Sequence, residues 1–101
     1  MSKMIVLHAD DNVGTLTAKM AKGDLVEYEV NGERLIVKLV EDIPLGHKAA
    51  LKDFNAEEHI VKYGEVIGKA NRPIKKGALV HIDNVESLRG RGDLKKEEQH
   101  S

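Results

Sequence analysis

The dipeptide Asn31-Gly32, which lies between two β-prone runs, constrains the fold of this chain more than any other feature. The flanking runs read LVEYEV and ERLIVK, and both are rich in Val, Leu, Ile or Tyr. Asn-Gly readily adopts the two positive φ angles of a type I′ turn, which joins paired antiparallel strands. The sequence therefore predicts a β-hairpin centred on this dipeptide.

A short turn motif recurs along the chain, in which an apolar residue is followed three positions later by glycine and then by a β-prone run. Its copies are 20–23, 43–46, 54–57 and 74–77, and Glu57 replaces the glycine in the third. Each copy predicts a tight turn that leads into a strand, and the four strands cover 24–30, 47–51, 58–62 and 78–82. The uneven intervals between copies argue against a solenoid repeat.

Two further segments near the amino terminus complete the predicted fold. Met4–His8 predicts a short strand, and Val13–Met20 favours a strand over a single helical turn. Many short strands with turn signals between them predict a mostly β fold in one domain over residues 1–90. Residues 91–101 read RGDLKKEEQHS, and this charged composition predicts a disordered, flexible tail.

The composition limits both the core and the class of protein. Aromatic residues make up only 3% of the 101 residues, so we expect a thin aliphatic core, which a large partner or a homo-oligomer would stabilise. The net charge of −1 lacks the basic excess that nucleic-acid binding demands. The lack of cysteine, of an apolar signal core and of a membrane-spanning run predicts a cytoplasmic protein that does not insert into membranes.

His47 is the first candidate for a chemical role, because it directly follows the glycine of the second turn motif. Glycine permits a sharp turn, so the next side chain can project from the rim of a sheet. An imidazole titrates near neutral pH and can therefore abstract or deliver a proton. The alternative is a solvated turn histidine without a catalytic role.

Other polar residues suggest weaker sites. His81 and Asp83 are separated by one residue, so in a strand both side chains would lie on one face and could share a metal ion or a proton. The alternative is a polar face of the strand that is simply exposed to solvent. Lys62 precedes a predicted break at Gly64 and could bind a carboxylate, unless it is an ordinary surface lysine. His8 lies beside Asp10, Asp11 and Asn12. These side chains could bind a metal or a substrate, but we favour a turn capped by the Asp and Asn side chains. We expect His59 to be exposed.

No nucleophile triad, phosphate-binding loop, dinucleotide fingerprint or zinc spacing is present in the sequence. If the protein is an enzyme, we therefore expect another chain to supply part of the active site.

Four segments taken together resemble a known family: DNV at 11–13, DIPLGHKAALKD at 42–53, VKYGEVIGKA at 61–70 and GALVHIDN at 77–84. They are similar, in order and spacing, to the amino-terminal SAF-type domain of altronate/galactarate dehydratases. The resemblance implies a β-clip fold that precedes a larger domain holding most of the dehydration machinery and a divalent metal, iron or manganese. Because the chain ends at Ser101, we expect the stand-alone small subunit of an altronate dehydratase or a sulfolactate sulfo-lyase, with a separate large subunit.

The resemblance also implies a reaction, the β-elimination of water or sulfite from a sugar acid or 2-hydroxy acid. It implies that His47 is the acid/base or a substrate contact, that Lys62 contacts the substrate carboxylate, and that His81 and Asn84 line the site. The family commonly reads His-x-His-Asn where this chain has Asp83 as the third residue, so a metal could touch Asp83 and His81 instead of two histidines. SAF-type domains also occur as non-catalytic carbohydrate- or protein-binding modules, and as an alternative the chain could serve only such binding or the oligomerisation of a larger subunit.

Overall fold

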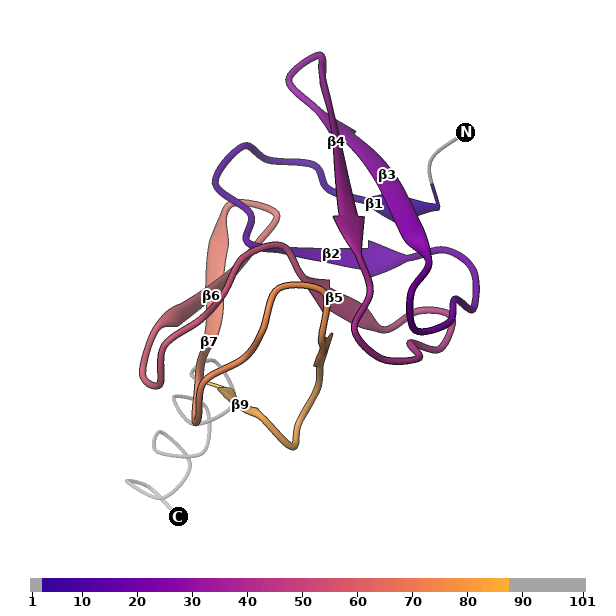
Figure 1. The fold of residues 1–101 in the computed structure, drawn as a ribbon. Helices are drawn as coiled ribbons and strands as arrows, with labels where there is room; N and C mark the ends of the chain where they lie inside the picture. Colours follow the sequence, from indigo (N-terminus) through magenta and orange to yellow (C-terminus); the bar gives the residue numbers. More distant parts are fainter. Residues whose placement is uncertain (1–2, 88–101) are drawn as a thin grey trace, which may run out of the picture.

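The computed structural model describes residues 3–87, which form short β-strands and contain no helix (Figure 1). The strands are β1 (Met4–Ile5), β2 (Val13–Leu16), β3 (Leu25–Val30), β4 (Glu33–Lys38), β5 (Lys48–Ala50), β6 (His59–Lys62), β7 (Glu65–Ala70), β8 (Leu79–Val80) and β9 (Val85–Ser87). The predicted mostly β fold of short strands and hairpins is confirmed. The predicted tail at 91–101 and the predicted domain end at residue 90 lie outside the described residues.

The strands of this region form antiparallel sheets. The largest has the order β1-β2-β5-β8, a second consists of β3 and β4, and a third has the order β6-β7-β9. Within residues 3–87 there is no helix with the length and apolar character needed to cross a membrane.

The predicted hairpin is confirmed as β3–β4. Val30 pairs with Glu33 across Asn31, with φ of 53°, and Gly32, with φ of 77°. The two positive φ angles are those that a type I′ turn requires. In Figure 1 this hairpin projects from the rest of the chain on the side opposite to β9. A second hairpin joins β6 to β7 through Tyr63 and Gly64, which also have positive φ, so the predicted break at Gly64 is confirmed.

All four copies of the turn motif adopt the same backbone conformation. Their last residues have φ of 91° at Gly23, 84° at Gly46, 75° at Glu57 and 88° at Gly77. Glu57 thus takes a conformation that usually requires glycine, while its carboxylate accepts a hydrogen bond from the Lys69 ammonium at 2.7 Å.

The turn motifs also contact one another in pairs. Met20 bridges to Ile43 in the first two copies, and Phe54 bridges to Ile74 in the last two, each bridge made by two reciprocal backbone hydrogen bonds. The motif therefore serves as a long-range connection as well as a local turn.

Several predicted strands are shorter in the structure. Val13–Met20 begins as a strand, as we favoured, but β2 ends at Leu16. The prediction for Met4–His8 holds only for its first two residues, because the chain turns where Asp11 N–H donates to His8 O at 3.0 Å. The strand predicted at 78–82 ends at Val80, because the chain turns where Asn84 N–H donates to His81 O.

The core is largely aliphatic, as the composition predicts, and it consists of two buried clusters. One includes Leu16, Val26, Val37, Leu39 and Ile43, and the other includes Val13, Phe54, Ile60, Ile74 and Val80. Adjacent alanines of β5 belong to different clusters, Ala49 to the first and Ala50 to the second. Because neighbouring side chains of a strand point to opposite faces, β5 lies between the two cores.

The two halves of the core also approach each other closely at Gly77. A Cβ atom at this position would lie 2.1 Å from the carbonyl oxygen of Lys38. Gly77 in addition donates a backbone hydrogen bond to Ala50 O and accepts one from Val40 N–H. Glycine is therefore required here both for its positive φ and for its lack of a side chain.

Candidate functional site

The structure brings together two of the predicted site residues, His47 and His81. Their rings stack with centroids 4.9 Å apart and an interplanar angle of 25°. The pairing of two strands explains this contact, because His47 immediately precedes β5, His81 immediately follows β8, and Lys48 of β5 pairs with Val80 of β8. Both histidines are half-buried.

The orientation of His47 is fixed further by the preceding turn. Its Nδ1 lies 3.3 Å from the carbonyl oxygen of Leu45. Since a carbonyl only accepts hydrogen bonds, Nδ1 must donate in this contact, which leaves Nε2 of a neutral ring as the proton acceptor. With Nδ1 donating to Leu45 O, the lone pair of Nε2 in a neutral ring can accept a proton, as a general base requires.

The segment that follows His81 corrects the sequence analysis. Residues 81–84 form a turn closed by a hydrogen bond from Asn84 N–H to His81 O at 3.0 Å, so His81 and Asp83 do not alternate along one face of a strand. The Asn84 side chain causes the turn, because its Oδ1 accepts from His81 N–H at 2.9 Å and its Nδ2 donates to Leu79 O at 2.8 Å. Asn and Asp side chains often compete with strand pairing in this way.

The predicted cation Lys62 has a neighbour that the sequence analysis missed. The pKa of Lys48 lies below its ordinary value, mainly because the side chain is partly buried and to a lesser extent because of the positive charge of Lys62. The Lys62 ammonium itself lies 4.8 Å from the ring centroid of Tyr63. Lys48 directly follows His47 in the sequence, but only the histidine of this segment was singled out.

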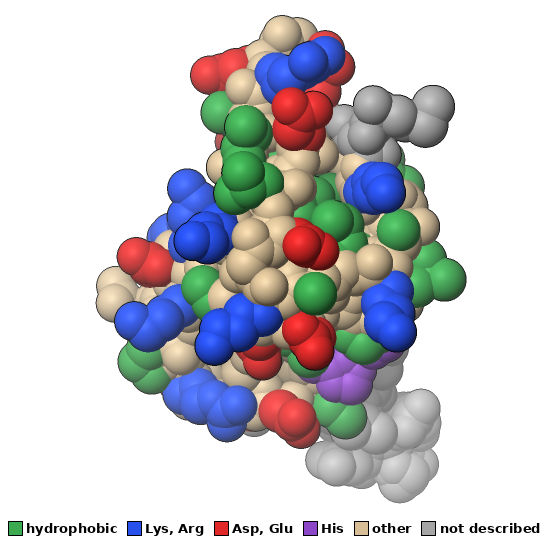
Figure 2. All heavy atoms as spheres, turned by 45° about the vertical axis from the view of Figure 1, so that its right-hand side comes forward, with side chains coloured by type: hydrophobic (Ala, Val, Ile, Leu, Met, Phe, Trp, Pro, Cys, Tyr) green, Lys and Arg blue, Asp and Glu red, His purple; other side chains and the backbone are tan. Residues whose placement is uncertain are grey.

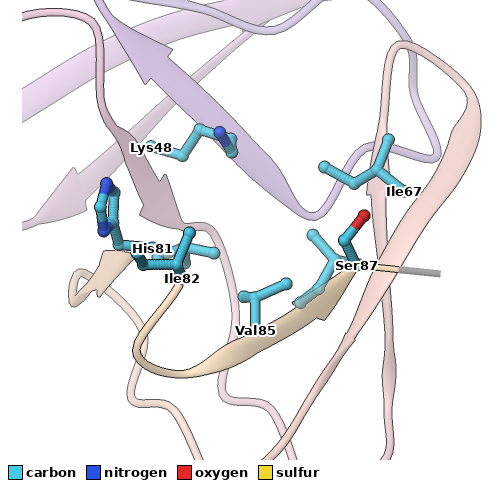
Figure 3. A pocket seen from close by; sticks show the side chains of 8 residues that line it. Lys48, Ile67, His81, Ile82, Val85 and Ser87 are labelled. Atoms are coloured by element: carbon cyan, nitrogen blue, oxygen red, sulfur yellow. The ribbon is translucent and has the colours of Figure 1, made fainter. Parts of the chain in front are cut away.

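A cavity of about 390 Å³ lies next to the histidine stack. Figure 3 shows Lys48 on one side of it, His81 beside Ile82 on another, and Val85 and Ser87 of β9 along a third. The remaining lining is aliphatic, from Ile60, Ile67 and Val80. The cavity thus combines a cation and an imidazole with a largely apolar wall.

The chain forms a turn at His8 that the Asp11 side chain caps, as we favoured. The Asp11 carboxylate is buried and accepts hydrogen bonds from His8 N–H at 3.3 Å and from Gly64 N–H at 2.8 Å. Asn12 similarly bridges to β6, since its side chain donates to His59 O and accepts from Val61 N–H. The His59 side chain is exposed, as expected.

The described residues do not fit a metal site of their own. Among residues 3–87, no three His, Asp or Glu side chains lie together in a group that could hold a metal ion. The rings of His47 and His81 face each other in a stack, and the Asp83 side chain is exposed. His81 and Asp83 thus lack a third His, Asp or Glu ligand among residues 3–87.

Fold and site together define a β domain that is free of helices over residues 3–87 and presents two stacked histidines, one of which lines a partly apolar cavity together with Lys48. Comparison with known proteins identifies its family. Residues 2–88 match the altronate/galactarate dehydratase SAF domain, and the chain belongs to this family.

Two relatives show how the domain is used in different proteins. The chain is 34% identical over 93 residues to the (2R)-sulfolactate sulfo-lyase subunit alpha of Chromohalobacter salexigens, covering 88% of this chain and 99% of that one. It is also 34% identical over 88 residues to the altronate dehydratase of Bacillus subtilis, covering 86% of this chain but only 17% of the dehydratase. The domain thus accounts for nearly all of one relative and a small part of the other.

A third relative gives a shorter match. The galactarate dehydratase (L-threo-forming) of Escherichia coli is 50% identical over 44 residues, which is 44% of this chain and 8% of that enzyme.

Proposed function

We propose that the chain is the small subunit of a two-chain lyase that catalyses a β-elimination on a sugar acid or a 2-hydroxy acid. The observation that carries this proposal is the His47–His81 stack, in which Nε2 of His47 is left as a proton acceptor. The relative with nearly the same length is named as one subunit of a lyase, which supports a separate partner chain. We place the enzyme in the cytoplasm, in agreement with the lack of cysteine.

In the proposed reaction, His47 Nε2 removes the proton from C2, next to the substrate carboxylate. The electron pair left on C2 is delocalised into the carboxylate and then forms the C2–C3 double bond as hydroxide or sulfite leaves C3. Negative charge grows on the carboxylate during the first step, so a nearby cation lowers the barrier. We assign this role to Lys62.

The remaining residues orient the base. His81 packs against the ring of His47, and Asn84 holds the turn that carries His81. Asn84 uses its oxygen and its amide group in backbone hydrogen bonds, which favours a positioning role over the substrate contact implied by the family resemblance. The divalent metal that the family implies, iron or manganese, would be held by the large subunit.

Reconstitution with the large subunit tests the proposal. The large chain should be co-purified with this chain from the native host, and elimination activity should be measured on altronate-type acids and on sulfolactate. Replacing His47→Ala should lower kcat by at least about 100-fold, as expected for the loss of a general base. The matched control is His59→Ala, an exposed histidine on β6, which should leave kcat unchanged.

Two results would contradict the proposal. Activity of the His47→Ala pair within a few-fold of the original would remove His47 from the chemistry. Recovery of the chain without any large dehydratase-type or lyase-type partner, together with binding of carbohydrate, would favour the non-catalytic binding module instead.

A further inference from the structure

Two large aliphatic side chains lie exposed beside the histidine stack. Leu45 is 63% exposed on the turn before His47, and Ile82 is 78% exposed directly after His81. Figure 2 shows histidine side chains at the lower edge of one face, with hydrophobic side chains next to them. Large aliphatic side chains at such positions are typical of a surface that another protein covers.

The cavity next to this surface requires an occupant of particular chemistry. Ile82 lies at its rim, and the aliphatic residues named above form most of its wall. Lys48 adds a positive charge, and no ion pair of Lys48 or Lys62 is found within the described part of the chain. An occupant that combines an apolar group with a carboxylate would satisfy both features.

A polyhydroxylated sugar acid does not meet this description, because the lining has polar side-chain groups only at Lys48, His81 and Ser87, fewer than its hydroxyl groups need when they lose their water. A protein segment meets it, since an apolar side chain next to Asp or Glu supplies both the apolar group and the carboxylate. A partner of sufficient size is also expected, because the same domain makes up only 17% of the altronate dehydratase chain.

We propose that Leu45, Ile82 and the cavity lined by Lys48 form the docking surface for the large subunit, which inserts an apolar side chain and a neighbouring carboxylate there. This inference rests on the proposed function, since it identifies where the partner binds. Docking at this surface would bring the large subunit to the edge of the His47–His81 stack. The active site would then close when the two chains associate.

The test is the dissociation constant of the complex between this chain and its purified large subunit, measured by isothermal titration calorimetry. Ile82→Asp and Leu45→Asp should each weaken binding by about 30-fold or more, as expected for central apolar contacts. Lys48→Met should weaken binding by about 10-fold and reduce its dependence on salt, because the methionine keeps the apolar stem without the charge.

The β3–β4 hairpin offers a matched control. Leu25 is 64% exposed and, like Ile36, lines a separate apolar groove of about 370 Å³. Leu25→Asp introduces the same change at nearly the exposure of Leu45, which is 63%, and should leave the dissociation constant within about 2-fold of the original. Circular dichroism of each variant shows whether it is folded.

Several outcomes would overturn the inference. Equal affinities for the original chain and for Ile82→Asp and Leu45→Asp would exclude this surface, and a loss confined to Leu25→Asp would place docking on the hairpin. A homo-oligomer that dissociates on Ile82→Asp would make a second copy the occupant. If Lys48→Met raised KM without changing the affinity of the two chains, the carboxylate would belong to the substrate. Failure of the original chain to bind any large subunit would instead contradict the proposed function.

Discussion

Replacing Asn84 by alanine separates a positioning role from a substrate contact. The Asn84 side chain makes two hydrogen bonds to the backbone, from His81 N–H at 2.9 Å and to Leu79 O at 2.8 Å. Each such bond contributes about 1 kcal/mol to stability, so Asn84→Ala should lower the free energy of unfolding by about 2 kcal/mol. For a domain of this size the melting temperature should fall by roughly 10 °C.

The effect on catalysis has its own signature. Without the side chain the turn at 81–84 loosens, and His81 no longer holds the His47 ring in place. In the reconstituted enzyme kcat should therefore fall about 10-fold or more while KM changes by less than 2-fold. The NMR signals of the His47 ring should also shift, which a stability change elsewhere in the fold would not cause.

The neighbouring Asn71 provides the control. Its side chain makes a single, longer hydrogen bond to Asp83 O, at 3.3 Å and exposed. Asn71→Ala should cost less than about 0.5 kcal/mol and should leave kcat unchanged. The reasoning fails if Asn84→Ala is as stable as the original chain, or if it raises KM alone, because Asn84 would then contact the substrate directly.

Two further predictions concern stability. Gly77→Ala should lower the free energy of unfolding, measured in urea, by at least about 3 kcal/mol, because the new Cβ meets the Lys38 carbonyl at 2.1 Å in addition to the strain of positive φ. Gly23→Ala, with no atom near its Cβ, should lower it by only about 1 kcal/mol. Equal costs of the two substitutions would contradict the close approach at Gly77. Lys48→Met should stabilise the isolated chain at pH 7. The folded-state pKa of Lys48 lies below its ordinary value of 10.5, so its charge opposes folding at neutral pH and this opposition is lost as the pH rises through the lowered pKa towards 10.5. The gain from Lys48→Met should therefore shrink above neutral pH, and a gain that grows with pH would refute it.

The parts of the fold that depend on local backbone preferences could be predicted from sequence. The hairpin at Asn31-Gly32 follows from the conformations these two residues favour. The turn motif was predictable even where Glu57 replaces glycine, because the spacing of its apolar residue and the following β-prone run was kept. Which turns pair with each other was not predictable, since Met20 and Ile43, like Phe54 and Ile74, meet only in the assembled fold.

In the candidate site, too, local features could be predicted from sequence and long-range contacts could not. Gly46 indicated that His47 would project from a turn, but its stacking on His81 depends on the pairing of β5 with β8, two strands that are distant in the sequence. The turn at His81 was missed because the Asn84 side chain bonds to the backbone in place of a neighbouring strand. Lys48 was missed because its significance lies in its burial, which the sequence around it does not reveal.

The central position of β5 has a consequence for motion. This strand is paired on both sides and lies between the two core clusters, whereas β3 and β4 pair only with each other. The amide protons of Ala49 and Ala50 should therefore exchange with solvent only when the whole domain unfolds, while those at the tip of the hairpin exchange through local opening. Because His47 directly precedes β5, we expect the backbone that carries the proposed base to stay ordered when the tip of the hairpin opens.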